Sequence, residues 1–181
     1  MSNPLKRMMI VTATGLTLLT LTGCYGTQGV NNSSEVNQQV EPCAAIRTLT
    51  DSYEQQFRDI RKAQRSLDRI TIWSTDYQIV GSSCEIWGWQ GGNYNYVCHY
   101  VAPDQSSAEE IYQRAKSTIR RCLPAQWTLQ ENALAQSPGS KAVFSLPEFG
   151  GVIDLRMLQT RGITTSRWAV YLMIGDYNSE L

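Results

Sequence analysis

The first 24 residues constrain the rest of this chain most strongly, because they are built like a secretion signal. Lys6 and Arg7 form a short positive region, and the stretch Met8–Leu21 is mostly apolar and carries no charge. These fourteen residues are too few for a permanent membrane-spanning helix, which needs roughly 20, but they fit the core of a signal peptide. We therefore expect residues 1–23 to be removed and the remaining chain to fold outside the cytoplasm.

The signal ends in Leu21-Thr22-Gly23-Cys24, which resembles the lipobox of bacterial lipoproteins: an aliphatic residue, two small residues and a cysteine. The resemblance implies that the Cys24 sulfur carries a diacylglyceryl group and that its freed amine takes a third acyl chain, such as palmitate. Two or more acyl chains give stable membrane anchoring. Tyr25 stands where aspartate would favour inner-membrane retention in enteric-type lipoproteins, so the resemblance implies an outer-membrane anchor with the protein facing the periplasm.

Residues 24–41 follow as the lipidated terminus and a tether. The segment Tyr25–Glu41 is rich in Gly, Asn, Ser and Gln, cannot bury enough apolar surface to order itself, and should span about 20 Å. Residues 42–181 then form the folded domain. Loss of Lys6 and Arg7 leaves 14 basic and 16 acidic residues, a formal charge of −2. A nearly neutral domain has no electrostatic basis for binding a phosphate backbone, so nucleic acid is excluded as a partner.

The hydrophobic pattern of the domain predicts two helices and seven strands. Helical spacing of apolar residues covers Ala44 to about Leu67 and again Ser106 to Arg121. The strands are expected at Ile70–Val80, Cys84–Trp89, Tyr94–Ala102, Trp127–Glu131, Ala142–Leu146, Val152–Leu158 and Arg167–Ile174. The order α-β-β-β-α-β-β-β-β predicts an α+β fold, in which an antiparallel sheet packs against two main helices. The two halves share the helix-then-strands order, without a residue-level repeat.

Four cysteines remain after Cys24: Cys43, Cys84, Cys98 and Cys122. An even number in an oxidising compartment predicts two disulfides, with three pairings open. The long first helix and the strand after it would both measure roughly 35 Å, which returns Cys84 toward Cys43. This geometry favours Cys43–Cys84 with Cys98–Cys122, and the runner-up joins Cys84 to Cys98 across the hairpin.

Residue types that carry catalysis or bind metal are scarce. His99 is the single histidine, no nucleophile-elbow pattern surrounds a serine, and no CxxC pair offers zinc ligands. Gly91-Gly92 lies between two strands, where it fits a hairpin turn better than a phosphate loop. We therefore expect no metal, no cofactor and no enzymatic activity, and hold a cell-envelope hydrolase with dispersed carboxylates as the weakest alternative.

The hairpin Cys84–Tyr100 is unusually aromatic. Side chains alternate between the two faces of a strand, so if the cysteines face the helices, Ile86, Tyr94, Tyr96 and Tyr100 do too. Glu85, Trp87, Trp89, Val97, His99 and Val101 would then point to the opposite face. Because aromatic residues dominate binding hot spots, Trp87, Trp89 and His99 are the candidate partner-binding residues, unless another layer covers them.

The layout of lipobox, polar tether and small disulfide-bonded domain resembles immunity lipoproteins that neutralise periplasm-acting toxins. It resembles them in plan only, and no site residue can be carried over. The resemblance implies a non-catalytic protein-binding module with a protein partner in the envelope. The alternative is an accessory lipoprotein of an envelope assembly, such as a secretion or pilus apparatus.

Overall fold

The computed structural model describes residues 41–161 and 166–176 of the chain. The signal segment, Cys24 and nearly all of the tether lie outside these ranges. The helices are α1 (Pro42–Tyr53) and α2 (Gln105–Cys122), with short 3-10 turns η1 (Arg58–Ile60) and η2 (Pro147–Phe149). The strands are β1 (Gln64–Leu67), β2 (Ile70–Ser74), β3 (Ser83–Trp89), β4 (Tyr94–Ala102), β5 (Thr128–Ala133), β6 (Gly139–Ser145), β7 (Val152–Arg161) and β8 (Ser166–Gly175). None of the described helices is both long and apolar enough to cross a membrane.

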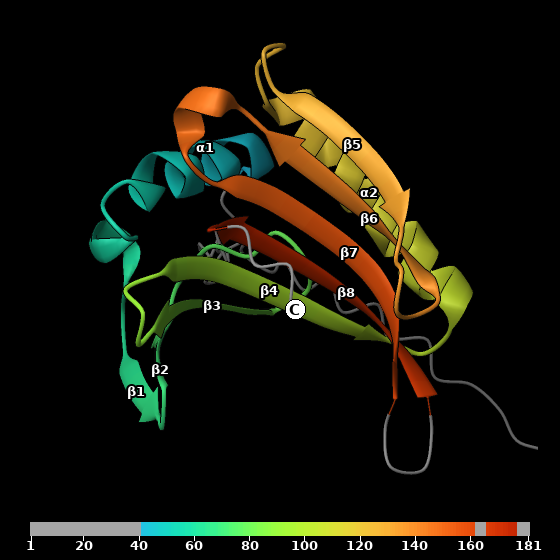
Figure 1. Cartoon of the computed structure of the whole chain (residues 1–181), viewed down its shortest axis with the longest axis horizontal. Helices are drawn as coiled ribbons and strands as arrows, with labels where there is room; N and C mark the ends of the chain where they lie inside the picture. The colour runs from blue at the N-terminus through green and yellow to red at the C-terminus, as the bar shows by residue number, and fades with distance from the viewer. Residues whose placement is uncertain (1–40, 162–165, 177–181) are drawn as a thin grey trace, which may run out of the picture. The chain divides into compact units, whose positions relative to one another are not determined.

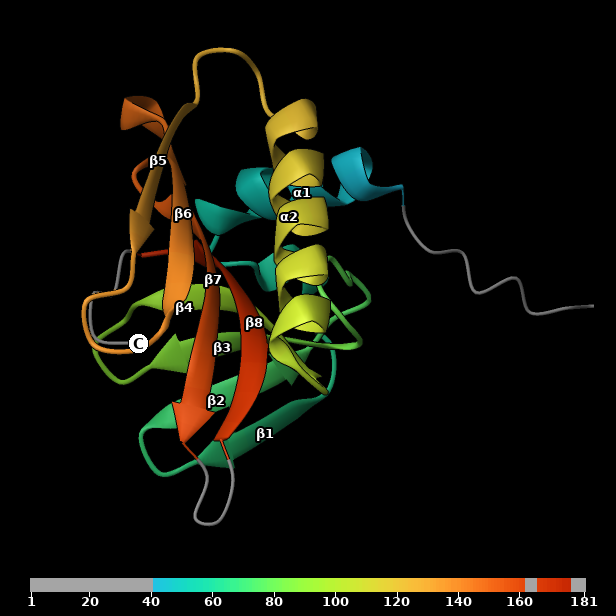
Figure 2. The same cartoon turned by 90° about the vertical axis from the view of Figure 1, so that its right-hand side faces the viewer.

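All eight strands form one antiparallel sheet in the order β1-β2-β3-β4-β8-β7-β6-β5. Each half of the chain is therefore a helix followed by a four-stranded meander, and the last strands of the two meanders, β4 and β8, pair at the centre of the sheet. This arrangement confirms the predicted α+β class. The sheet twists so strongly that β1–β4 run across the direction of β6 and β7 (Figure 2).

Both helices pack on the same face of the sheet (Figures 1 and 2). Ile46 and Leu49 of α1 and Ile119 of α2 are completely or almost completely buried there. The strands contribute Ile86, Tyr96, Phe144, Ile153, Leu155, Leu172 and Ile174 to the same cluster, none of them measurably exposed. Burial of so many large apolar side chains between the two layers supplies the main driving force for folding.

The first helix is half as long as its sequence pattern predicts. It starts at Pro42, where the Glu41 carboxylate accepts a hydrogen bond from Ala44 N at 3.0 Å. It ends at Tyr53 because Gln56 and Phe57 adopt left-handed φ angles of 58° and 61°. The turn still brings Phe57 into the core, where it has no exposed surface. Phe57 is therefore buried in the core, as its spacing in the sequence predicts, although it does not lie in a helix.

The rest of the predicted helix is instead a turn and a short strand. Residues 64–67 form β1, which pairs with β2 in a hairpin. The strand expected over Ile70–Val80 stops at Ser74, and residues 75–82 form the connection to β3. The first of these differences adds one strand to the predicted seven, and the second only shortens a predicted strand.

The disulfides join Cys43 to Cys122 and Cys84 to Cys98, so both bridges of the favoured pairing are wrong and the runner-up, which joins Cys84 to Cys98, is the pairing observed. With only 12 residues, α1 rises about 18 Å and does not carry the chain far enough for Cys84 to return to Cys43. Cys84 and Cys98 stand directly opposite each other in the β3–β4 register. Cys43 at the start of α1 meets Cys122 at the end of α2.

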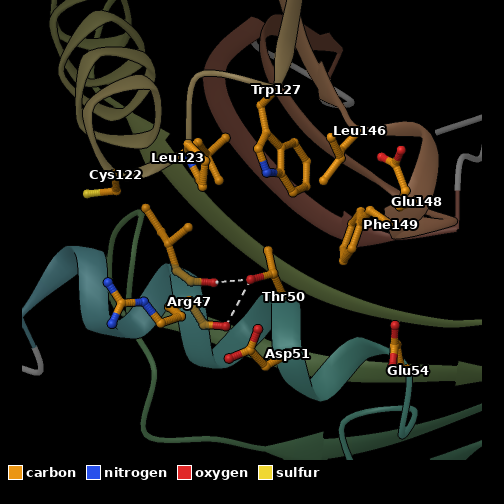
Figure 3. Close-up of a pocket in the computed structure, with 12 residues that line it drawn as sticks. Arg47, Thr50, Asp51, Glu54, Cys122, Leu123, Trp127, Leu146, Glu148 and Phe149 are labelled. Carbon is orange, nitrogen blue, oxygen red and sulfur yellow. Dashed lines mark hydrogen bonds between the residues drawn. The ribbon is translucent and has the colours of Figure 1, made fainter.

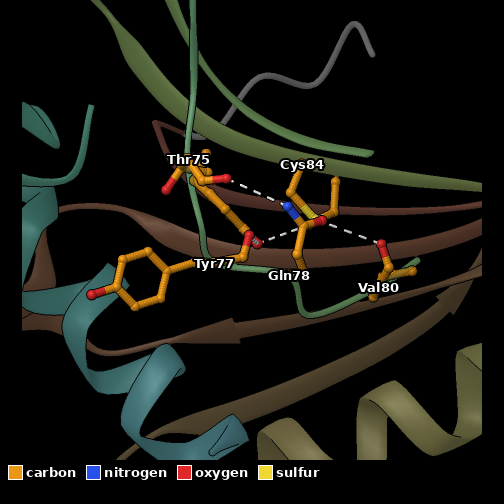
Figure 4. Close-up of a disulfide and its surroundings, with 7 residues drawn as sticks. Thr75, Tyr77, Gln78, Val80 and Cys84 are labelled. Atoms are coloured by element: carbon orange, nitrogen blue, oxygen red, sulfur yellow. Dashed lines mark hydrogen bonds between the residues drawn. A yellow bond between two sulfur atoms is a disulfide. The ribbon is translucent and has the colours of Figure 1, made fainter. Parts of the chain in front are cut away.

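The two bridges stabilise different parts of the fold. The Cys43–Cys122 bridge joins the two helices and closes 79 residues, and the Cys84–Cys98 bridge closes 14. On the chain-entropy model these loops correspond to about 4.5 and about 3 kcal/mol. Around the shorter bridge, the 75–82 connection packs Val80 against Cys84, and its Tyr77 carbonyl accepts a 2.9 Å hydrogen bond from the Tyr96 hydroxyl (Figure 4).

Candidate functional site

The sheet face opposite α1 and α2, which we call the distal face, carries the predicted binding residues. It is defined by the alternation of the strands: the cysteines of β3 and β4 belong to the core on the helix side, so their sequence neighbours point the other way. Across the strands, the register aligns the distal-face residues in rows, such as Ile72, Trp87 and Asn95. No described helix or strand packs against this face.

Trp87 and Trp89 lie side by side on β3 and are both half-buried. Their ring centroids are 5.8 Å apart in an edge-to-face arrangement. The Trp87 indole N–H donates to Glu85 at 3.3 Å, and the Trp89 indole N–H donates to the Asn95 side chain at 3.1 Å. These hydrogen bonds hold both rings in place, so a partner would meet a preformed aromatic surface rather than one that must be ordered on binding.

His99 lies on the same face and stacks on Tyr171 of β8, with ring centroids 6.0 Å apart. The two residues are register partners at the centre of the sheet. Val101, two residues further along β4, is 47% exposed and is one of two exposed large apolar side chains among the described residues. The other is Leu67 on β1, which pairs with Ile70 at the far edge of the same face. The distal face thus exposes an apolar side chain at its edge, on β1, and another at its centre, on β4.

A hollow of about 300 Å³ lies between these elements. Its walls are the side chains of four neighbouring strands: Trp87, Val97, Tyr171, Met173, Leu158 and Arg156. All but Arg156 are apolar or aromatic. A hollow of this size and lining accommodates one or two apolar side chains of a partner, in the way hot-spot anchors fill pockets at protein interfaces.

Arg156 forms a buried ion pair with Asp154 beside the hollow. Arg156 is 5% exposed and Asp154 is 1% exposed. The Arg156 Nη2–Asp154 Oδ2 distance is 2.6 Å, and Nε lies 3.0 Å from each carboxylate oxygen. The two residues are two positions apart on β7, so their side chains share the distal face. Burial of a charge pair is costly, and the mutual hydrogen bonds offset that cost.

The structure therefore places Trp87, Trp89 and His99 on the same face, as the alternation predicted, but His99 lies four residues along β4 from the position that pairs with Trp87. Sequence reasoning missed Asp154, Arg156, Tyr171 and Met173, which come from the last hairpin. The signal for two of them is present: an acid and a base at alternate positions interrupt the apolar run of Val152–Leu158. What the sequence could not supply is the β4–β8 pairing that brings this hairpin beside the tryptophans.

Within residues 41–161 and 166–176, no three His, Cys, Asp or Glu side chains are grouped closely enough to hold a metal ion. The chemistry that the distal face offers is apolar and aromatic contact around one internal ion pair. Comparison of the chain with protein-family models, with curated proteins and with solved structures finds no match.

Proposed function

We propose that this chain is a lipoprotein of the bacterial envelope, anchored through Cys24, whose periplasmic domain binds a protein partner without catalysis. The distal face is the binding surface in this proposal. The observation that carries it is the half-buried Trp87–Trp89 pair beside an apolar hollow, on a face that no described element covers. Rigid aromatic side chains next to a pocket are the usual composition of the centre of an interface.

The disulfides support the envelope location. All four cysteines after Cys24 are paired in the structure, and stable disulfides form in oxidising compartments such as the periplasm. A toxin-neutralising role suits such a module, because an immunity protein acts by occupying its target and needs no reaction of its own. The accessory role in an envelope assembly uses the same surface, and a toxin gene beside the coding gene would favour the immunity role.

The anchor is tested by mass spectrometry of the full-length protein isolated from membranes. We expect a chain that begins at Cys24 and carries the mass of a lipid, whereas a Cys24→Ser variant remains unacylated. An intact Met1 terminus on an unmodified chain would disprove the lipoprotein assignment.

The binding face is tested by photo-crosslinking in living cells with a benzoylphenylalanine residue placed at single positions of the full-length chain. Position 101 is exposed on the distal face, and position 113 is exposed on α2 as the matched control. We expect a discrete crosslinked protein from position 101 and none from position 113. The crosslink should fade when Trp87→Ala and Trp89→Ala are combined with the probe. A crosslink that comes only from position 113, or one insensitive to both tryptophans, would contradict the proposal.

A further inference from the structure

A second, larger depression lies on the helix side of the domain, between α1 and the η2 turn. This α1–η2 groove has a volume of about 550 Å³, within the range of ligand pockets. One wall is α1 with its cap residue, from which Thr50, Asp51 and Glu54 line the groove, and the opposite wall holds Trp127, Glu148 and Phe149 (Figure 3). It shares no lining residue with the hollow on the distal face.

The side of the groove opposite α1 carries two aromatic rings, which we call its aromatic floor, and these rings are firmly held. Trp127 and Phe149 have ring centroids 5.1 Å apart, and Tyr53 packs behind Phe149 at 4.9 Å. The Trp127 backbone is fixed twice: its N–H donates to the Pro124 carbonyl at 3.1 Å, and its carbonyl accepts from Arg120 at 2.8 Å. Gly150, with a φ of +71°, lets the chain turn away directly after Phe149. The aromatic floor is therefore preformed.

The rim of the groove is acidic on both walls. Asp51 comes from α1, Glu54 caps the end of α1, Glu148 comes from η2, and all three are exposed. None of the three forms an ion pair with another residue of the described part of the chain. Arg47 is the single base among the lining residues. The groove therefore has an excess of negative charge around an aromatic floor.

We propose that the α1–η2 groove binds a peptide segment of a protein partner that presents lysine or arginine next to an apolar residue. The cationic head would lie between carboxylates from the two walls, and the half-buried ring of Phe149 favours the same charge through cation–π attraction. The apolar neighbour would pack on Leu123, which lines the groove and is 9% exposed. The tether residues 25–41 contain no lysine or arginine, so the chain's own tether lacks the cationic side chain that this groove would bind.

The test is a titration of the isotopically labelled protein, followed by the indole N–H signals of its five tryptophans. The probe is a capped pentapeptide of alternating leucine and lysine, and the control peptide has glutamine at each lysine. We expect the lysine peptide to shift the Trp127 signal and the glutamine peptide to leave it in place. Trp87 and Trp89 report the distal face in the same spectra, so the two surfaces are read independently.

Two triple variants with the same change in net charge test whether the acidic rim is responsible for peptide binding. Asp51→Asn, Glu54→Gln and Glu148→Gln should weaken peptide binding about tenfold. The matched control, Asp68→Asn, Glu109→Gln and Glu110→Gln, removes three acids away from the groove and should bind like the parent protein. Glu110 lies about 18 Å along α2 from Cys122.

An unmoved Trp127 signal, or equal loss of affinity in the two triple variants, would overturn the proposal. A peptide that shifts Trp87 and Trp89 alone would also overturn it, while leaving the proposed function of the distal face intact. Self-association of the protein that the rim variants abolish would assign the groove to a second copy of the chain, and this too would overturn the proposal.

Discussion

The two faces of the sheet differ in what their side chains do. On the helix side, the strands contribute Ile86, Phe144, Leu155 and Leu172, all without exposed surface and all in contact with one apolar cluster. On the distal face, half-buried aromatics alternate with polar side chains around an ion pair. Buried apolar side chains also occur on the distal face, among them Ile72, Val97 and Met173. The distal face thus differs from the helix side in its half-buried tryptophans, which the proposed binding function uses.

The largest expected difference between the faces comes from two neighbours on β6. Phe144 is completely buried on the helix side, and Val143 is half-buried on the distal face. Phe144→Ala should destabilise the domain by about 4 kcal/mol, because it removes apolar contacts and leaves a cavity. Val143→Ala should cost about 1 kcal/mol. Urea unfolding of the oxidised protein measures both, and equal losses would mean that the two faces contribute equally to stability.

The alternation of side chains along the strands made it possible to predict which residues lie on which face of the sheet. The pattern Cys84–Trp89 places the cysteines on one face and the tryptophans on the other, and the structure has them so. The second helix and the last four strands also follow their sequence patterns to within a few residues. These are segments in which local periodicity and the tertiary environment agree, so the sequence alone is sufficient.

The end of the first helix could not be predicted, because no local signal marks it. Gln56 and Phe57 adopt left-handed backbone angles that glycine or asparagine usually provides, and Ile60 and Leu67 continue the helical spacing by coincidence. The error in helix length then produced the error in disulfide pairing, since the pairing was inferred from lengths. The site could not be predicted in full either. Arg156 and Tyr171 lie on the same face as the tryptophans only because strands distant in the sequence pair with each other.

The second prediction compares two ion pairs on the distal face. Asp154 and Arg156 are buried, whereas Arg65 and Glu85 are partly exposed, with 58% and 24% of their side chains accessible. Asp154→Ala should destabilise the domain by about 3 kcal/mol, because the buried guanidinium loses this carboxylate. Glu85→Gln should cost less than about 1 kcal/mol.

Thermal unfolding of the two variants and the parent protein checks this prediction. Similar small shifts in melting temperature would show that the Asp154–Arg156 pair is hydrated and not part of the rigid face. Gln159→Ala, a half-buried neighbour on β7, controls for general disturbance of the strand.

The third prediction concerns the tryptophans that the binding proposal needs. Trp87→Ala and Trp89→Ala should each lower the free energy of unfolding by about 1 kcal/mol, since each ring already contacts solvent over part of its surface. Combined with the probe, the same substitutions should weaken the crosslink from position 101. A loss of stability as large as that of Phe144→Ala would place the tryptophans in the core and remove the main support for a binding face.

The smallest expected effect concerns Tyr53, a tyrosine on the helix side of the sheet. Tyr53 packs on that side, its hydroxyl donates to Asp176 at 2.8 Å, and burial followed by this hydrogen bond raises the pKa of Tyr53 to about 12. The fold thus favours the neutral phenol over the phenolate. Its contribution to stability is complete below pH 10, the ordinary pKa of tyrosine, and is lost as the pH rises from 10 through 12.

Ultraviolet titration of tyrosinate in the native protein measures this pKa. In Tyr53→Phe the high-pH step should lose one group, and stability between pH 10 and 12 should fall less steeply than in the parent protein. If Tyr53→Phe leaves the alkaline titration unaltered, the Tyr53–Asp176 contact does not hold the end of β8 against α1 in solution.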